Sequence, residues 1–416
     1  MTDLDDLAAE LDIRLADADA DLARRYPGDR GVRQPVHTVY IPADRYHATS
    51  VREWGRQAQD VLDEHGSTGA ELADALAISP DLAVQLYERL REKLDREPIE
   101  DLRIDFEDGL GVRPDDEEDA IAIAAARALV ESAAPSPYCG IRFKSLEAPT
   151  RRRGLRTLDL FVAELARAGG IPDGFVVTLP KVTSVDQVDA MVIACDRLEK
   201  AHGLTAGSLR FEIQVECPQA IVGPDGRALV APMIHASHGR CTGLHYGTYD
   251  YSAACGISAA HQSMDHPAAD HAKVVMQAAA ASTGVHVSDG STNVLPVGDR
   301  DSVRAAWRLH LRLVCRSLER GFYQGWDLHP AQLPSRFVAV FGFYREGLPA
   351  AASRLHAYVA KTESGFLDEP ATAIALAGFI QRGVECGAVD VEEAQALTGL
   401  DESRLRALAR PRALGA

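Results

Sequence analysis

Short strand-like segments alternate with longer helix-like segments between residues 38 and 328, and this alternation constrains the fold more than any other feature of the chain. The strand-like segments are eight runs, at 38–41, 102–106, 140–143, 174–179, 210–215, 243–246, 284–287 and 323–328. Helical stretches rich in Ala and Leu separate most of them, such as 117–132, 154–168, 184–202 and 301–320. Eight strand-and-helix units predict an α/β fold of the (β/α)₈ or TIM-barrel type. A doubly wound open sheet is the alternative, but the chain has no glycine-rich turn of the dinucleotide-binding or P-loop kind.

The chain divides into three predicted parts. These are an acidic N-terminal helix within 1–35, the barrel at 36–345, and a helical C-terminal extension at 346–416. Two helices are expected in the extension, at 348–361 and 371–386. Because the extension lacks a strand pattern, we expect it to serve as a lid over the barrel mouth or as an oligomer contact, with simple packing on the barrel flank as the alternative.

Composition excludes several classes of protein. The 416 residues carry a formal charge of −17, which argues against a nucleic-acid-binding protein, because no domain-wide basic face could offset it. The seven cysteines are scattered and contain no C-x-x-C pair, as is typical of a reduced compartment. The acidic N-terminus is unlike a signal peptide, and no apolar run approaches the roughly 18 residues of a membrane span. We therefore expect a cytoplasmic protein with neither membrane nor nucleic acid as a partner.

Polar and charged residues follow almost every predicted strand at its carboxyl end. They are Asp44, Arg45, Asp105, Glu107, Asp108, Arg142, Lys144, Lys181, Gln214, Glu216, Asp250, Asp289 and His329. The catalytic groups of a barrel enzyme come from several strand ends that converge on one mouth. The sequence therefore predicts an active site at this end of the barrel.

Two carboxylates of this set, Glu216 and Asp250, are the candidate metal ligands. Glu216 ends one predicted strand, and Asp250 follows the next, after a run of glycines and hydroxyls at 243–249. Mg²⁺ takes one or two protein carboxylates and leaves its other positions to water and substrate oxygens. Mg²⁺, or Mn²⁺ in its place, is the predicted cofactor. The alternative is that both carboxylates are structural, capping loops or pairing with arginines.

Seven motifs, in order along the chain, resemble those of one known family. They are VYIPADR at 39–45, IDFED at 104–108, IRF at 141–143, TLPKV at 178–182, QVE at 214–216, GTYD at 247–250 and WDLHPAQ at 326–332. Together they resemble the citrate lyase β-subunit, malyl-CoA lyase and HpcH/HpaI aldolase family of the phosphoenolpyruvate/pyruvate barrel superfamily. The Gln at 214 resembles a feature of aldolases that act on free keto acids, and the YDY run at 249–251 resembles a feature of malate synthases. The chain thus resembles a divergent branch.

The resemblance implies a metal-dependent carbon–carbon lyase or aldolase that acts through an enolate. Its substrate would be a short hydroxy or keto acid with a pyruvate- or glyoxylate-like unit, or the CoA thioester of such an acid. Because an enolate develops negative charge, a cation held in place would stabilise it. The alternatives are a malate-synthase-like condensing enzyme and, from another class, a catalytically silent barrel that binds a keto acid or CoA ester. The resemblance also implies a homo-oligomer.

The positions of residues at strand ends and the resemblance to the family together suggest roles for individual residues. Arg142 offers a fixed fork of donors for a substrate carboxylate or the enolate oxygen, with a strand-end salt bridge as the alternative. Glu107 is expected to touch substrate or to orient Arg142, with Asp108 beside it as a substrate-binding residue. Lys181 is a candidate catalytic residue, or else a partner of this acidic group.

The remaining candidates lie further from the predicted metal. Gln214 is expected to bind substrate or a metal-bound water, or to make a plain loop hydrogen bond. His329 is expected at the substrate or behind it. Arg153, in the basic cluster at 151–156, would bind an anionic substrate or CoA phosphates, or belong to a solvated helix start. In the extension, Asp368 or its neighbour Glu369 is the predicted proton donor or substrate contact.

Overall fold

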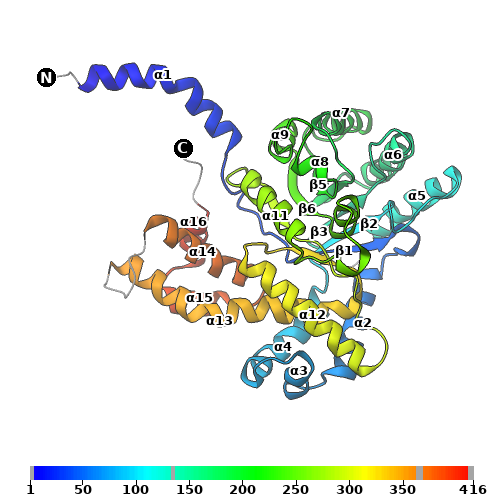
Figure 1. The fold of residues 1–416 in the computed structure, drawn as a ribbon, viewed down its shortest axis with the longest axis vertical. Coiled ribbons are helices and arrows are strands. Elements are labelled where there is room, and N and C mark those ends of the chain that lie inside the picture. Colours follow the sequence, from blue (N-terminus) through cyan, green and yellow to red (C-terminus); the bar gives the residue numbers. More distant parts are fainter. Residues whose placement is uncertain (1–3, 133–135, 362–368, 411–416) are drawn as a thin grey trace.

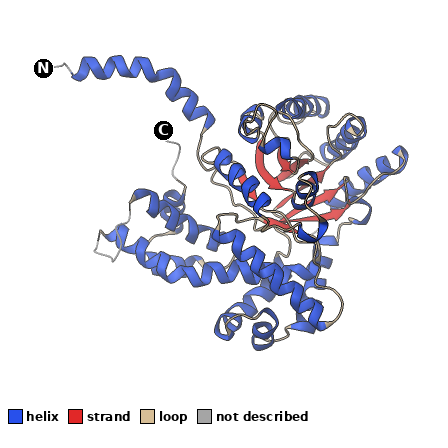
Figure 2. Ribbon diagram, viewed as in Figure 1, coloured by secondary structure: helices blue, strands red, loops and turns tan. Residues whose placement is uncertain are grey.

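The computed structural model describes residues 4–132, 136–361 and 369–410, and within them eight parallel strands form one barrel (Figures 1 and 2). The strands are β1 (His37–Pro42), β2 (Asp101–Asp105), β3 (Tyr138–Arg142), β4 (Phe175–Leu179), β5 (Arg210–Val215), β6 (Cys241–Tyr246), β7 (His286–Ser288) and β8 (Gly325–Asp327). Their order is β7-β6-β5-β4-β3-β2-β1-β8. A parallel bridge between Ser288 and Gln324 joins the two ends of this order. The predicted barrel is confirmed, and each predicted strand overlaps an observed one.

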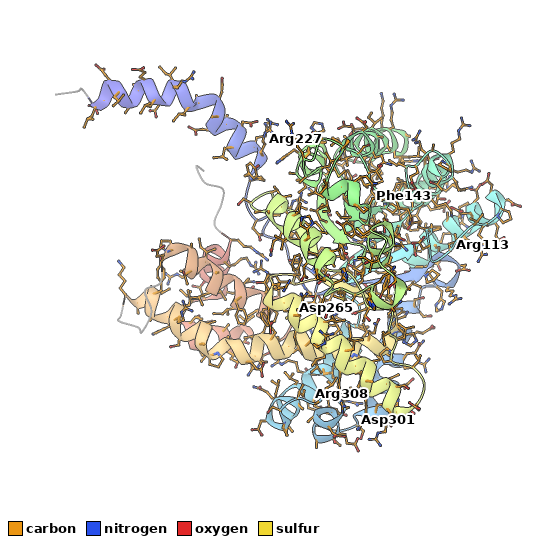
Figure 3. All side chains as sticks on the ribbon, viewed as in Figure 1. Arg113, Phe143, Arg227, Asp265, Asp301 and Arg308 are labelled. Carbon is orange, nitrogen blue, oxygen red and sulfur yellow. The ribbon has the colours of Figure 1, made fainter. Side chains whose placement is uncertain are left out.

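Helices surround the barrel between successive strands. They are α2 (Ser50–His65), α3 (Gly69–Leu76), α4 (Pro80–Arg96), α5 (Asp115–Glu131), α6 (Arg151–Arg167), α7 (Val185–His202), α8 (Pro218–Ile221), α9 (Val230–Ala236), α10 (Thr248–Ala254), α11 (Pro267–Ala280) and α12 (Arg300–Glu319), with short 3₁₀ turns at Ala43–Arg45, Ala259–His261 and Pro330–Gln332. Side chains on the outer helices tie neighbouring helices together. Figure 3 shows Arg308 of α12 near α3, and its guanidinium donates to the carbonyls of Asp74 (2.7 Å) and Ala75 (2.9 Å).

The predicted N-terminal helix is α1 (Leu4–Arg25), which projects away from the barrel with none of its residues buried (Figure 1). The segment that follows it crosses the amino-terminal end of the barrel. There, Gly28 N–H donates to Ser282 O (2.9 Å), Arg30 to Cys241 O (2.6 Å) and Gln34 to Val287 O (3.2 Å). This linker, residues 26–36, therefore lies against the starts of β6 and β7 before the chain enters β1.

The extension differs from its prediction. Its first helix, α13 (Leu333–Ala360), begins directly after the turn that follows β8 and continues through the predicted boundary at 345. Residues 333–342 are all buried. A segment that is buried on every side lacks the helical period that would identify it in the sequence, and here its Arg336 is buried against Asp327. Helix α14 (Pro370–Glu385) matches its prediction, and α15 (Val391–Thr398) and α16 (Glu402–Ala409) complete the extension.

The described part of the extension packs at the amino-terminal end of its own barrel. Arg382 of α14 lies over the ring of Tyr323, which precedes β8, with 4.4 Å between its guanidinium carbon and the ring centroid. Arg410 donates to the carbonyl of Val32 in the linker (3.1 Å). None of the helices in the described ranges has the length and apolar character needed to cross a membrane.

The contact between β3 and β4 leaves no room for a side chain at Gly140. A Cβ there would lie 1.7 Å from the carbonyl oxygen of Val176, whereas a Cβ at Gly342 in α13 would have its nearest neighbour, Leu82 Cδ2, at 3.5 Å. We expect Gly140→Ala to lower the free energy of unfolding by about 1–3 kcal/mol or more through overpacking. Gly342→Ala should instead raise it by roughly 0.5–1 kcal/mol, because Ala restricts the unfolded chain. Chemical denaturation measures both, and equal stabilities would contradict the close strand pairing.

Candidate active site

The carboxyl ends of β2 to β6 bring most of the predicted site residues into one cluster. We call these residues the mouth cluster: Asp105, Glu107, Asp108, Arg142, Lys181, Gln214, Glu216 and Asp250. Asp105 and Arg142 end β2 and β3, and their Cα positions are directly opposite each other. Asp250 lies in the first turn of α10, directly after β6. Parallel strands thus assemble at one edge residues that are far apart in the sequence.

The fork of Arg142 is already occupied within the protein. Its Nε donates to Asp105 Oδ1 (2.8 Å) and its Nη2 to Asp105 Oδ2 (2.6 Å). The remaining Nη1 lies 3.2 Å from Glu107 Oε2 and 3.4 Å from Gln214 Oε1. Tyr40 of β1 supports the guanidinium, with 4.8 Å from its carbon to the ring centroid. The structure therefore shows the strand-end salt bridge and leaves Nη1 as the donor nearest the other cluster residues.

Lys181 connects the carboxylates of three strands. Its Nζ lies 2.6 Å from Glu107 Oε1 and 3.1 Å from Asp250 Oδ2, and its backbone N–H donates to Glu216 Oε1 (2.7 Å). Lys181 has φ of 53°, in the left-handed region that is uncommon outside glycine. This conformation lets one residue offer its backbone to Glu216 and its side chain to the other two carboxylates. Backbone strain of this kind, about 1–3 kcal/mol, persists where the surroundings enforce it and is frequent in active sites.

Glu216 is buried, and the cluster fixes the position of its carboxyl group. Gln214 Nε2 donates to its Oε2, and Gly247 lies so close that a Cβ there would be 2.4 Å from Glu216 Cβ and 2.9 Å from Oε2. Burial, together with the negative charges of Glu107 and Asp250, raises the pKa of Glu216 to about 8. Asp250, by contrast, has a side chain that is 47% exposed. The pair thus places one buried and one solvent-facing carboxylate on either side of Lys181.

The charges of the mouth cluster do not balance. Five carboxylates (Asp105, Glu107, Asp108, Glu216 and Asp250) face two cations (Arg142 and Lys181), a difference of 5 − 2 = 3 negative charges when all are ionised. A divalent cation would offset most of this excess. Carboxylate oxygens are hard ligands, and Mg²⁺ needs only one or two of them. Within the described ranges, no three His, Cys, Asp or Glu side chains are grouped so as to hold a metal ion. The residues present fit a Mg²⁺ ion that keeps water or substrate as ligands.

Asp108, a member of the mouth cluster, and His329, which follows β8, are the two remaining candidates at the strand ends. Asp108 has a side chain that is 61% exposed, 3.5 Å from Lys181 Nζ. His329 uses its Nδ1 to accept the N–H of Ala331 (3.2 Å), and Gln332 Oε1 accepts the N–H of Leu328 (2.8 Å). The HPAQ motif therefore builds the turn after β8. Substrate contacts of Asp108 and His329 stay predictions.

Arg153 lies outside the mouth cluster. It pairs with Asp119 (2.6 Å), Asp115 (3.3 Å) and Glu118 (3.4 Å) of α5, whose first turn is acidic. Arg153 and Arg156 of the basic cluster at 151–156 are thus paired with carboxylates of a neighbouring helix. Asp368 lies outside the described residues, and Glu369 stands at the N-cap of α14. Their predicted roles are not tested.

The sequence indicated the members of the cluster but not how they are supported. Tyr40 beneath Arg142 and Gly247 beside Glu216 stand in the motifs at 39–45 and 247–250, without a role predicted for either. A signal for an interior site was present in the runs DLRID at 101–105 and EIQVE at 212–216. In each run, alternate positions are polar, which places all the polar side chains on one face of the strand. In a barrel, that face is the interior.

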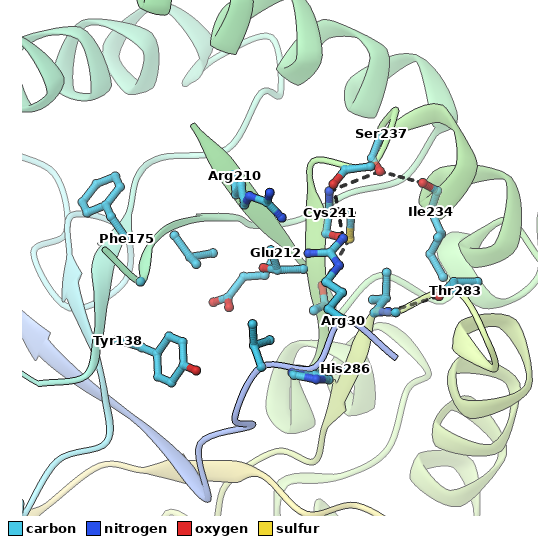
Figure 4. A pocket seen from close by; sticks show the side chains of 18 of the residues that line it. Arg30, Tyr138, Phe175, Arg210, Glu212, Ile234, Ser237, Cys241, Thr283 and His286 are labelled. Carbon is cyan, nitrogen blue, oxygen red and sulfur yellow. Dashed lines mark hydrogen bonds between the residues drawn. The ribbon is translucent and has the colours of Figure 1, made fainter. Parts of the chain in front are cut away.

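A cavity lies at the other end of the barrel, among the described residues. It has a volume of about 1110 Å³ and is lined by the amino-terminal starts of strands and by the linker (Figure 4). Its wall includes Arg30, Arg210 and His286 but no residue of the mouth cluster. The mouth cluster and this cavity are therefore two separate sites.

Comparison with known protein families assigns the chain to one of them. The profile of one family, described as a domain of unknown function, matches residues 15–413. The chain belongs to the DUF6986 family. No curated protein matches it significantly.

The DUF6986 chain is similar in structure to a citrate lyase from Burkholderia xenovorans LB400, with 19% identity and a TM-score of 0.60 over 89% of this chain and 100% of that one. It is also similar to the malate synthase of Haloferax volcanii in a magnesium and glyoxylate complex, with 15% identity and a TM-score of 0.49 over 92% of this chain and 98% of that one. CitE of Mycobacterium tuberculosis with magnesium and acetoacetate has 16% identity and a TM-score of 0.46 over 84% of this chain and 98% of that one. The first similarity supports the barrel fold.

The close approach of Gly247 to Glu216 generates a test of the metal site. Gly247→Ala would force the Glu216 side chain to move, because the new Cβ has no space beside it. We expect binding of Mg²⁺ or Mn²⁺, measured by calorimetry, to weaken by about tenfold or more, since displaced ligands lose most of their coordination energy. Gly342→Ala is the matched control, because that glycine lies in α13. Unchanged metal binding by Gly247→Ala would contradict the assignment of Glu216 as a ligand.

Proposed function

We propose that the protein is a Mg²⁺-dependent carbon–carbon lyase or aldolase that acts on a short carboxylate-bearing hydroxy or keto acid, or on its CoA thioester. One observation carries the proposal. Glu216 and Asp250 meet around Lys181 at the barrel mouth, beside Arg142, in a cluster with more negative than positive charge. Five of the seven motifs described above supply the residues of this cluster, in the order of the resembling family.

The proposed metal would be held by Glu216 and Asp250. Mg²⁺ bound there would supply a Lewis acid for the negative charge that develops on an enolate. Lys181 contacts both carboxylates, so it would position them and adjust its own pairing when a cation arrives. Gln214 donates to Glu216 and accepts from Arg142, which fixes the Glu216 carboxyl orientation.

Glu107 is the proposed proton-transfer group. Burial raises the pKa of the Glu107 carboxyl, although Arg142 opposes the shift. Its Oε2 is buried, has no hydrogen-bond donor among the described residues and faces Arg142 Nη1 at 3.2 Å. A general acid or base works best when its pKa is moved toward the working pH. The same Nη1 would orient a substrate carboxylate next to Glu107.

The metal ligands are tested with isosteric variants. We expect Glu216→Gln and Asp250→Asn to lose Mg²⁺-dependent turnover of a panel of keto acids and CoA esters while keeping the folded circular dichroism spectrum. Each change removes a charged ligand without removing volume. Asp44→Asn is the control, because Asp44 also follows a strand but pairs with Arg113 (3.1 Å). Turnover at the wild-type rate by either ligand variant would refute the metal assignment, and metal binding without turnover of any panel member by the wild type would favour the silent barrel.

Arg142 is tested by replacement with lysine. An ammonium cannot hold both oxygens of Asp105 and still present a donor to the site, so Arg142→Lys should lose about 2 kcal/mol of transition-state stabilisation or more, roughly a 30-fold fall in kcat/KM. Arg153→Lys is the matched control, since its pairs lie between α5 and α6. Full activity of Arg142→Lys would show that the arginine serves only the strand ends.

We further propose that the protein is a homo-oligomer whose extension serves a neighbouring copy. The described part of the extension contacts the amino-terminal end of its own barrel, away from the mouth cluster. A lid formed by the turn at 365–370 would therefore reach the mouth of another subunit. Truncation before Leu348 would cut α13, whose Leu348 and Leu355 are buried, so point variants are the better test.

Mixing two inactive variants tests this arrangement. We expect Glu216→Gln alone and the pair Asp368→Asn with Glu369→Gln alone to be inactive. A co-expressed equal mixture should recover about a quarter of wild-type activity, because half the mouths and half the extensions are intact and pair at random in a symmetric oligomer. Recovery supports a site shared between subunits. No recovery, or full activity of the extension variant by itself, would rule the shared lid out.

A further inference from the structure

The cavity at the amino-terminal end of the barrel is a second candidate site. Its volume of about 1110 Å³ is at the upper end of the range for small-molecule pockets, which is roughly 300–1,000 Å³. The starts of β3 to β7 form one side, and the linker at 26–36 forms another. Figure 4 shows Arg30, Arg210, Glu212 and His286 around the open space, with Phe175 and Ile234 on its walls.

Arg30 holds a charge that the protein leaves uncompensated. Its Nη2 donates to the carbonyls of Cys241 (2.6 Å) and Gly239 (3.2 Å), which are neutral groups. No carboxylate of the described residues forms an ion pair with it. Burial lowers the pKa of Arg30, and the positive charge of Arg210 lowers it further. Arg30 and Arg210 thus line the same cavity, close enough for the charge of one to act on the other.

The other arginines of the wall differ from this pair. Arg103 donates to Glu212 (2.8 Å) and to Asp101, and Arg33 pairs with Glu97 (2.9 Å) and Glu100. Arg24 and Arg25 at the end of α1 both pair with Asp21. Arg210, at the exposed start of β5, has no ion pair with any described carboxylate. The positive charge available to a ligand is therefore concentrated at Arg30 and Arg210.

The rest of the wall is mixed: Asp101 and Glu212 are paired with Arg103, Asp173 is a further carboxylate at its rim, and two histidines add ring nitrogens. Burial lowers the pKa of His286 to about 4, so its ring is neutral near pH 7 and offers hydrogen bonds without charge. His245 is buried, and its Nδ1 has no hydrogen-bond partner among the described residues. Phe175 and Ile234 add apolar surface. A ligand that matches this wall has an oxyanion at one end and an apolar portion.

We propose that this cavity binds a small molecule bearing an oxyanion, a phosphate or a carboxylate, which pairs with Arg30 and Arg210 while its apolar part lies against Phe175 and Ile234. Guanidinium groups bind both kinds of oxyanion through paired N–H donors. The cavity opens at the opposite end of the strands from the mouth cluster. The ligand is thus separate from the substrate of the proposed reaction.

Thermal unfolding of the full chain, at fixed ionic strength and without divalent metal, tests the site with inorganic phosphate and with succinate as probes. A ligand that binds only the folded state raises the unfolding temperature as its concentration rises. We expect one or both probes to do so in the wild type. A larger effect of phosphate assigns a phosphate ligand, and a larger effect of succinate assigns a carboxylate.

Variants locate the effect. Arg210→Gln removes one cation from an exposed position without breaking an ion pair, so the fold should persist, and Arg30→Gln removes the other. Each should raise the apparent Kd of the effective probe by about tenfold or more, as expected for loss of a charge-assisted hydrogen bond. Arg197→Gln, on the outer face of α7, should leave it unchanged. The proposal is overturned if neither probe stabilises the wild type, or if Arg210→Gln responds like the wild type.

Discussion

Two buried arginines in the barrel interior, Arg103 and Arg142, fix how the strands pair and therefore where the side chains of both barrel ends lie. Arg103 in β2 donates to Glu212 of β5 (2.8 Å), and Arg142 at the end of β3 donates to Asp105 of β2 (2.6 Å). A buried charge without a partner costs several kcal/mol. A slip of one residue in either strand would move these side chains to the other face and separate the pairs. The strand register is therefore specified by charge as well as by apolar packing.

The buried charged groups around Arg103 and those around Arg142 differ in how far positive and negative charges balance. This difference indicates where a ligand would bind. Around Arg103, the carboxylates Asp101 and Glu212 are joined by His245, whose Nε2 lies 2.9 Å from Glu212. Burial raises the pKa of Asp101, which favours its neutral form and brings the groups around Arg103 close to neutrality. The mouth cluster around Arg142 has five carboxylates for two cations, and burial also raises the pKa of Glu107 and Glu216, so its full negative charge develops only when these two ionise, as they would beside a bound cation. Charge that a protein leaves unbalanced in a buried place is frequent where a ligand completes the site.

The ends of the barrel thus suit ligands of opposite charge. Carboxylates predominate at the carboxyl ends of the strands, whereas Arg30 and Arg210 remain without anions at the amino-terminal end. Parallel strands create this separation, because every strand contributes its first residues to one end and its last residues to the other. The linker after α1 contributes Arg30, so a segment outside the barrel completes the cationic end.

The barrel and the members of the mouth cluster could be predicted from the sequence alone. Strand-sized apolar runs and the charges that follow them are local features, so Glu216, Asp250, Arg142 and Lys181 were identified without knowledge of their contacts. Boundaries were less well determined where the local pattern was ambiguous, as in the first turns of α13, which are buried on every side.

Which charges are already paired could not be predicted from the sequence and follows from the folded structure. The fork of Arg142 is held by Asp105, 37 positions away, and Arg153 is balanced by Asp119, 34 positions away. Local sequence does not encode such distances, because they depend on how the strands and helices are brought together. The same reason applies to the cavity: Arg30 and Arg210 are separated by the first half of the barrel in the chain, and they share a wall only when the linker crosses the closed sheet.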